Sequence, residues 1–214
     1  MKYLLILVIS LLFLGCARQQ KKFDDPLFEK EKKRVLELAE KYMDLPPITV
    51  TAQVCERSAG GIHDFYSEGD YWWPDPENPE GPYIRKDGMT NPDNFTAHRY
   101  AMIRLSQLCG TFASAYLVTD DIQYATQMVP HLKAWFIDEA TLMNPSLNYA
   151  QAIKGKETGR GIGIIDTIQL LDVVKAIMAI ESAGVLSADE LSGLKAWFSS
   201  YLNWMDSHPY GISE

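Results

Sequence analysis

The sequence has 214 residues, of which 47% are hydrophobic and 22% are charged. This balance is typical of a globular protein and excludes a disordered tail, a fibrous repeat or a small disulfide-held domain. The formal net charge is −8. A surface that follows a phosphate backbone needs excess Lys and Arg, so this charge argues against general binding to nucleic acid or anionic lipid.

The first 15 residues are typical of an export signal. Lys2 precedes an apolar run over 3–14, which as a helix is about 18 Å long and too short to cross a membrane. Phe13–Cys16 is similar to the bacterial lipobox, whose cysteine is lipidated. We expect a signal peptide over 1–15, lipidation of Cys16 and a polar tether over 16–25, with a plain signal peptide cut nearby as the alternative. These features predict an exported protein, lipid-anchored in the periplasm or at the outer membrane.

The remaining chain is mostly helical by its apolar spacing, which indicates an all-α fold. We expect a first region over 26–59, made of a helix and a short extended segment, and a helical domain over 60–214. The residues Ile48–Val54 are the best strand candidate. Apolar residues recur at helical spacing over five segments: 26–43, 97–118, 120–139, 167–183 and 187–206.

Local signals mark the ends of the last two helices. Asp166 is expected to cap the fourth helix and Gly184 to end it in a left-handed turn. Ser187 and Glu190 have the spacing of a capping box. Short turns join the second helix to the third and the fourth to the fifth, so we expect each pair to pack antiparallel.

A long loop over 56–95 contains an aromatic and acidic run. Long loops without regular structure in a compact domain are usually binding loops or lids. Aromatic faces stack on sugar rings and carboxylates accept hydroxyl protons, although both tryptophans could instead pin the loop to the helices. The carboxylates lack EF-hand spacing, so no metal is expected. The candidate sugar-binding residues are Asp70, Tyr71, Trp72, Trp73 and Asp75.

A second loop, over 143–165, ends in the glycine-rich run Gly159–Asp166. No strand precedes this run and it lacks the P-loop lysine, so a nucleotide site is not supported. Glycines before a helix allow close approach of a ligand, and Arg160 among them supplies a fork-shaped cation suited to a carboxylate. The alternative is a surface arginine on a tight turn. Further candidates for the site are Asn148, Tyr149 and Gln151.

The cysteines beyond Cys16 are Cys55 and Cys109, and no Cys/His cluster has metal-ligand spacing. Cys109 lies in an apolar helical pattern, which favours a buried packing role over a ligand or nucleophile. A Cys55–Cys109 disulfide is the less favoured alternative, permitted by an export compartment.

Three motifs resemble the alginate lyase domain of bacterial polysaccharide lyases: Asp70–Pro76, Asn144–Gln151 and Gly159–Thr167, in this order. The resemblance covers about residues 60–214. It implies an (α/α) toroid of helical hairpins around a cleft for an acidic polysaccharide, alginate or a related uronic-acid polymer. It also implies β-elimination without a cofactor, in which a base removes the C5 proton and an acid protonates the leaving O4.

Family members carry an Asn-Asn-His motif shortly after a segment like Tyr201–Glu214, and this sequence contains none. We therefore expect the catalytic residues to lie downstream of Glu214, the chain to be a truncated N-terminal half of the toroid, and this fragment to be inactive. The helices over 167–183 and 187–206 are then expected to expose apolar faces.

Two other functions stay open at this level. One is a non-catalytic glycan-binding lipoprotein that uses the same aromatic loop. The other is a toroid-fold glycoside hydrolase of the inverting type, which needs two carboxylates about 6.5–9.5 Å apart. The acids available for it are Asp70, Asp75 and Asp166.

Overall fold

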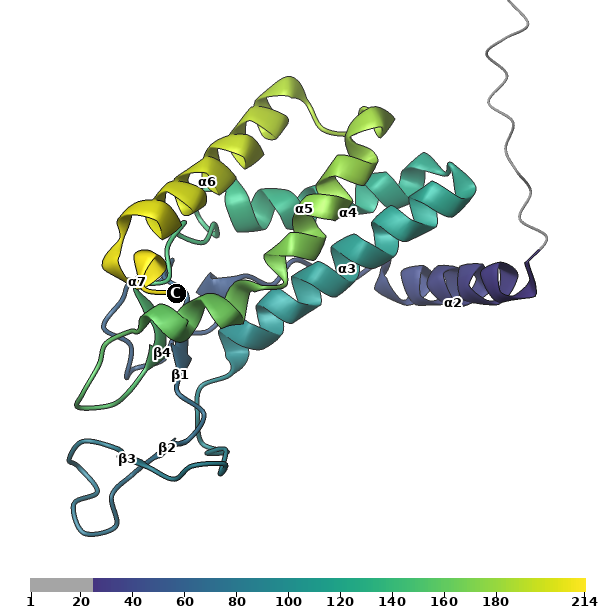
Figure 1. Ribbon diagram of the computed structural model, residues 1–214. Helices are drawn as coiled ribbons and strands as arrows, with labels where there is room; N and C mark the ends of the chain where they lie inside the picture. The colour runs from purple at the N-terminus through teal and green to yellow at the C-terminus, as the bar shows by residue number, and fades with distance from the viewer. Residues whose placement is uncertain (1–24) are drawn as a thin grey trace, which may run out of the picture. The chain divides into compact units, whose positions relative to one another are not determined.

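A computed structural model describes residues 25–214 of the chain (Figure 1). The predicted signal peptide, the predicted lipidation site Cys16 and all of the tether except Asp25 lie outside the described residues. The chain divides after Lys33, and residues 34–214 form one compact unit. The division falls within helix α2 (Pro26–Tyr42). No helix among the described residues is both long and apolar enough to cross a membrane.

The prediction of a mostly helical chain is confirmed. Helix α3 (Ala97–Thr119) is the longest helix and packs against α4 (Ile122–Phe136) and α5 (Leu170–Ile180) (Figure 1). Their shared core contains fully buried side chains from all three helices, among them Phe112, Met128 and Val173. Burying large apolar side chains of this kind contributes about 1.5–3 kcal/mol each to folding.

The last two long helices run antiparallel across a short turn (Figure 1), and each has its main contacts with another helix. Helix α5 packs on α3, whereas α6 (Ala188–Ser207) packs on α4 and on the short helix α7 (Pro209–Ile212). Aromatic side chains fix this arrangement, because the rings of Trp197 and Phe198 lie 4.7 Å and 5.1 Å from that of Phe136 on α4. Aromatic packing therefore fixes α6 against α4.

Most helix ends agree with the sequence signals. Ser187 and Glu190 form both bonds of the capping box, and Gly184 adopts a left-handed φ of 66°. The prediction for Asp166 is wrong. This residue lies within a 3-10 helix, η2 (Gly161–Thr167), and α5 begins only at Leu170. The Asp166 side chain is buried and binds groups from other segments, so it is not a helix cap.

The two predicted loops, over 56–95 and 143–165, contain four short strands. Strands β1 (Tyr66–Glu68) and β4 (Tyr149–Ala152) pair in parallel, and β2 (Trp72–Trp73) pairs antiparallel with β3 (Ile84–Arg85). Strands of two to four residues are too short to produce a visible alternation of polar and apolar residues. The β2–β3 hairpin lies beyond β1 and β4, away from helices α4 to α6 (Figure 1).

The predicted strand over Ile48–Val54 is wrong, since Val50–Ala52 forms a 3-10 turn, η1. The Thr49 hydroxyl accepts a hydrogen bond from the Thr51 N–H at 3.3 Å. Such local bonds between side chain and backbone compete with strand formation.

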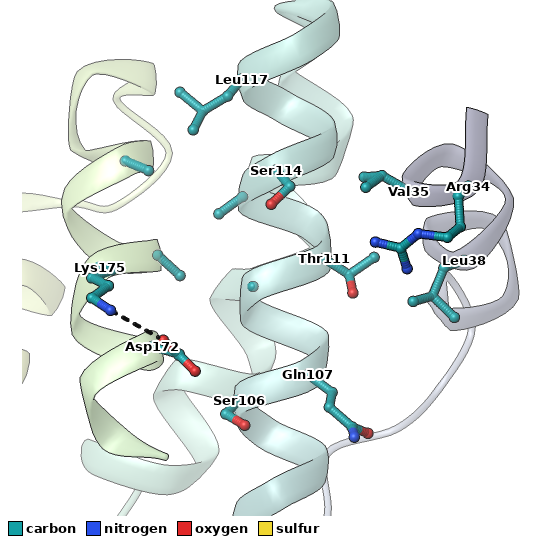
Figure 2. A pocket seen from close by; sticks show the side chains of 14 residues that line it. Arg34, Val35, Leu38, Ser106, Gln107, Thr111, Ser114, Leu117, Asp172 and Lys175 are labelled. Atoms are coloured by element: carbon teal, nitrogen blue, oxygen red, sulfur yellow. Dashed lines mark hydrogen bonds and ion pairs between the residues drawn. The ribbon is translucent and has the colours of Figure 1, made fainter. Parts of the chain in front are cut away.

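Helix α5 and the segment before it expose apolar side chains, as the sequence predicts. Ile165, Ile168, Leu171 and Met178 are each more than half exposed, and Leu202 on α6 is also exposed. A hollow of about 460 Å³ lies between α2, α3 and α5. Figure 2 shows its walls, where Thr111 of α3 faces Val35 and Leu38 of α2. Small side chains on α3 produce this hollow, which contains the exposed ion pair between Asp172 and Lys175.

Candidate functional site

A pocket of about 440 Å³ forms where the two predicted binding loops meet the beginning of α3. It brings together five of the residues predicted from the sequence. These are Asp70, Tyr71, Trp72, Gln151 and Arg160, and the other lining residues are Arg85, Arg99, Ile162, Ile165 and Asp166. The parallel pairing of β1 with β4 explains this meeting, because each strand leads directly into one half of the pocket wall.

The buried carboxylate of Asp166 joins the two loops beneath the pocket. The Ser67 hydroxyl donates to Asp166 and accepts a hydrogen bond from the Gln151 N–H at 2.8 Å. The side-chain Nε2 atom of Gln151 lies 3.2 Å from both carboxylate oxygens of Asp166. The backbone of Gln151 has a left-handed φ of 56°. A buried polar network is stable when each member finds a partner, and this one holds β1, β4 and η2 together.

Arg99, in the first turn of α3, completes this network. Its Nε lies 3.0 Å from Asp166, Nη1 donates to Asp70 at 2.6 Å, and Nη2 donates to the Glu68 carbonyl at 3.0 Å. Burial alone lowers the pKa of Arg99, but the charges of Asp166 and Asp70 outweigh it and raise the pKa. Sequence reasoning missed Arg99, because no local motif distinguishes it from other charged residues on a helix.

Arg160 holds a different position, bound only to neutral groups among the contacts described. Its Nε donates to the Gln151 carbonyl at 2.7 Å, and Nη2 lies 3.3 Å from the Gln151 side-chain oxygen. Among residues 25–214, no carboxylate lies within 4.0 Å of its guanidinium. Burial lowers its pKa. The pocket therefore contains a fixed cation that lacks a carboxylate partner, which suits an anionic ligand.

Gly69 allows the tryptophan and this cation to approach each other. A Cβ atom at Gly69 would lie 2.6 Å from Trp72 Cδ1 and 2.8 Å from Arg160 Nη2. Both distances are shorter than carbon and nitrogen contacts permit. Any larger residue at this position therefore has to displace part of the pocket wall.

Glu68, directly before Gly69, anchors this part of the chain. Its carboxylate accepts two bonds from Arg57, at 2.6 Å and 2.7 Å, and one from the Phe95 N–H at 2.7 Å. Burial raises the pKa of Glu68, but these donors outweigh it and lower the pKa overall. A bidentate pair of this kind fixes geometry as well as charge.

Four of the predicted site residues do not line the pocket. Trp73 donates from its indole nitrogen to the Met89 carbonyl, and the Asp75 carboxylate accepts from the Glu77 N–H within a turn. Asn148 accepts from Trp204, and Tyr149 packs beside the small apolar cluster of Cys55, Tyr66 and Ala152. These contacts hold the loops in place.

The buried histidines and cysteines have structural surroundings. His98 accepts a hydrogen bond from the Tyr66 N–H at 2.9 Å and contacts the Gln53 carbonyl at 2.8 Å. Cys55 and Cys109 are free and buried, and the buried position of Cys109 agrees with its predicted packing role. Burial raises the pKa of Cys109 to about 12. Within residues 25–214, no three His, Cys, Asp or Glu side chains are grouped to hold a metal ion.

Comparison with known proteins agrees with the motifs that form the pocket. The family model described as "Alginate lyase" matches residues 49–214. The crystal structure of an alginate lyase from Bacteroides ovatus is 35% identical, with a TM-score of 0.81. The match covers 88% of this chain and 50% of that one, so the chain spans half the length of that enzyme. No curated protein matches the chain. The family match and the structural similarity together show that the chain belongs to the alginate lyase family.

Proposed function

We propose that this chain is the uronate-binding part of a polysaccharide lyase that acts on alginate or a related uronic-acid polymer by β-elimination. The observation that carries the proposal is Arg160, a fixed cation without a carboxylate partner beside the exposed ring of Tyr71 and the half-buried ring of Trp72. Three arginines and two aspartates line this pocket, which leaves a net positive charge within a chain whose formal charge is −8.

This arrangement suits the chemistry of elimination. The proton on C5 is weakly acidic, and its removal places negative charge on the neighbouring carboxylate. A fixed cation that binds the carboxylate stabilises that charge where it develops. In this proposal Arg160 binds the carboxylate, and the aromatic rings of Tyr71 and Trp72 stack on the sugar.

The proposal includes the larger assembly and its location. The described helices belong to an (α/α) toroid, and export with lipidation of Cys16 holds the protein in the periplasm or at the outer membrane. Replacing Cys16 with Ser should abolish incorporation of labelled palmitate and release the protein from membranes. A Cys16→Ser protein that remains labelled would overturn the anchor.

The pocket favours the hydrolase less than the lyase. A hydrolase requires a free acid and a free base at the site, whereas Asp70 and Asp166 both bind Arg99 and Asp75 does not line the pocket. Incubation with an alginate tetrasaccharide separates the three functions. Binding by calorimetry, with products that absorb in the ultraviolet through a C4–C5 double bond, supports the lyase. Reducing ends without that absorbance support the hydrolase. Binding without any product agrees with a chain that supplies uronate binding alone, and absence of binding overturns the proposal.

A further inference from the structure

A lysine lies over each of the two tryptophans of the β2–β3 hairpin. The Nζ atom of Lys156 is 4.9 Å from the centre of the Trp72 ring, and that of Lys86 is 4.9 Å from the Trp73 ring. Cations at this distance are attracted by the electron-rich face of an indole. Each ammonium group therefore has a preferred place over its ring.

Neither ammonium group has a carboxylate within 4.0 Å among residues 25–214, although most neighbouring cations do. Lys154 lies 3.7 Å from Glu80, and Arg85 lies 3.0 Å from Asp87. Lys156 and Lys86 can therefore bind an external anion without breaking an ion pair.

The two lysines differ in where their tryptophans face. Trp72 pairs across the hairpin with Arg85, and both line the pocket, whereas Trp73 pairs with Ile84, and neither does. Side chains of adjacent residues in a strand point to opposite faces. Lys156 is thus placed at the edge of the pocket, whereas Lys86 belongs to the opposite face of the hairpin.

A tight turn fixes the backbone that presents Lys156. Its N–H donates to the Ile153 carbonyl at 2.9 Å, and the Ile153 N–H donates to the Glu157 carbonyl at 2.8 Å. Gly155 has a φ of 74°, and a Cβ atom there would lie 2.7 Å from the Cα of Pro82. The turn is therefore held closely against the chain that leads into β3.

We propose that Lys156 and Trp72 form a second carboxylate-binding subsite, which takes the uronate next to the one bound by Arg160. The inference rests on the proposed function and adds Lys156 as a residue that binds the carboxylate of the neighbouring sugar. A uronic-acid polymer carries one carboxylate on every sugar. The edge of the Trp72 ring and the Arg160 guanidinium both lie next to Gly69, and the Lys156 ammonium group lies over the face of the same ring. The two cations therefore flank the Trp72 ring.

The test compares two ligands, an alginate tetrasaccharide and its carboxyl-reduced, neutral form, by calorimetry at low salt. Lys156→Gln should weaken binding of the charged tetrasaccharide about threefold to fivefold, the size expected for an ion pair that keeps contact with solvent. Binding of the neutral ligand should not change, and Lys156→Arg should restore affinity. Lys86→Gln is the matched control, because it removes the same lysine–tryptophan contact outside the pocket and should leave both affinities unchanged.

Two results overturn the subsite alone. One is an unchanged affinity of Lys156→Gln for the charged ligand. The other is an equal loss for both ligands, which would mean that the lysine only supports the Trp72 ring. If the unaltered protein binds no alginate tetrasaccharide, the proposed function itself fails.

Discussion

Arg99 on α3 and Asp166 on η2 lie 67 positions apart in sequence and form an ion pair of 3.0 Å beneath the pocket. The Asp166 side chain is 6% exposed and that of Arg99 is 19% exposed. The pair connects the longest helix to the glycine-rich segment that carries Arg160. The position of the proposed carboxylate binder therefore depends on a contact with Arg99, which lies outside the three motifs.

Replacing Asp166 with Asn should lower the free energy of unfolding by about 3 kcal/mol, because it leaves the buried Arg99 with only Asp70 to balance its charge. Urea unfolding followed by circular dichroism measures the change. Asp172→Asn is the control, since its pair with Lys175 is exposed and should matter by less than about 0.5 kcal/mol. Equal effects of the two substitutions would contradict the structural role of Asp166.

Gly69→Ala should disturb the pocket, because the added methyl group overlaps Trp72 and Arg160. We expect a loss of about 1–3 kcal/mol in unfolding free energy, the usual cost of overpacking, together with weaker binding of an alginate tetrasaccharide. Gly110→Ala on α3 is the matched control. Nothing lies within 4 Å of its Cβ position, so the helix should gain about 0.5–1 kcal/mol. Unchanged stability and binding in Gly69→Ala would contradict this prediction, because it would show that Trp72 and Arg160 can move away from the added methyl group at no cost.

Arg160→Ala should weaken binding of the tetrasaccharide by about 1.5–3 kcal/mol, the range for hydrogen bonds to charged groups. Calorimetry with the same ligand measures it, and Lys175→Ala on the exposed side of α5 should bind normally. An unchanged affinity for Arg160→Ala would remove this residue from the site.

Acidification below about pH 6.5 should destabilise the fold through the buried histidines His98 and His131. Burial lowers the pKa of His98, and burial followed by the nearby charge of Arg104 lowers that of His131 to about 4. In the unfolded chain a histidine takes up a proton near pH 6.5. In the folded protein both histidines remain largely neutral at that pH, because their pKa values are lower. The contribution of these two histidines to the free energy of unfolding is therefore fully present above about pH 6.5. It falls as the pH decreases towards their pKa values in the folded protein. Urea unfolding between pH 7.5 and 4.5 checks the sign, and a flat profile down to pH 5 would contradict it.

Sequence patterns sufficed where the deciding interaction is local. The capping box of Ser187 and Glu190 and the left-handed turn at Gly184 depend on a few consecutive residues, and both were predictable. Asp166 shows the limit of this reasoning. An aspartate before an apolar helix has the signature of a cap, yet distant Ser67 and Arg99 bind its carboxylate.

The sequence by itself determined the family, the long helices, and the two loops that carry Trp72 and Arg160. Periodicity, caps and motifs each depend on residues that are close together in the sequence. Only the tertiary structure decided which predicted residues meet. The pairing of β1 with β4 brings Trp72 and Arg160 into one pocket and leaves Trp73 and Asn148 outside it. It also brings in Arg99, since ion pairs and strand pairing join residues whose separation along the chain leaves no local pattern.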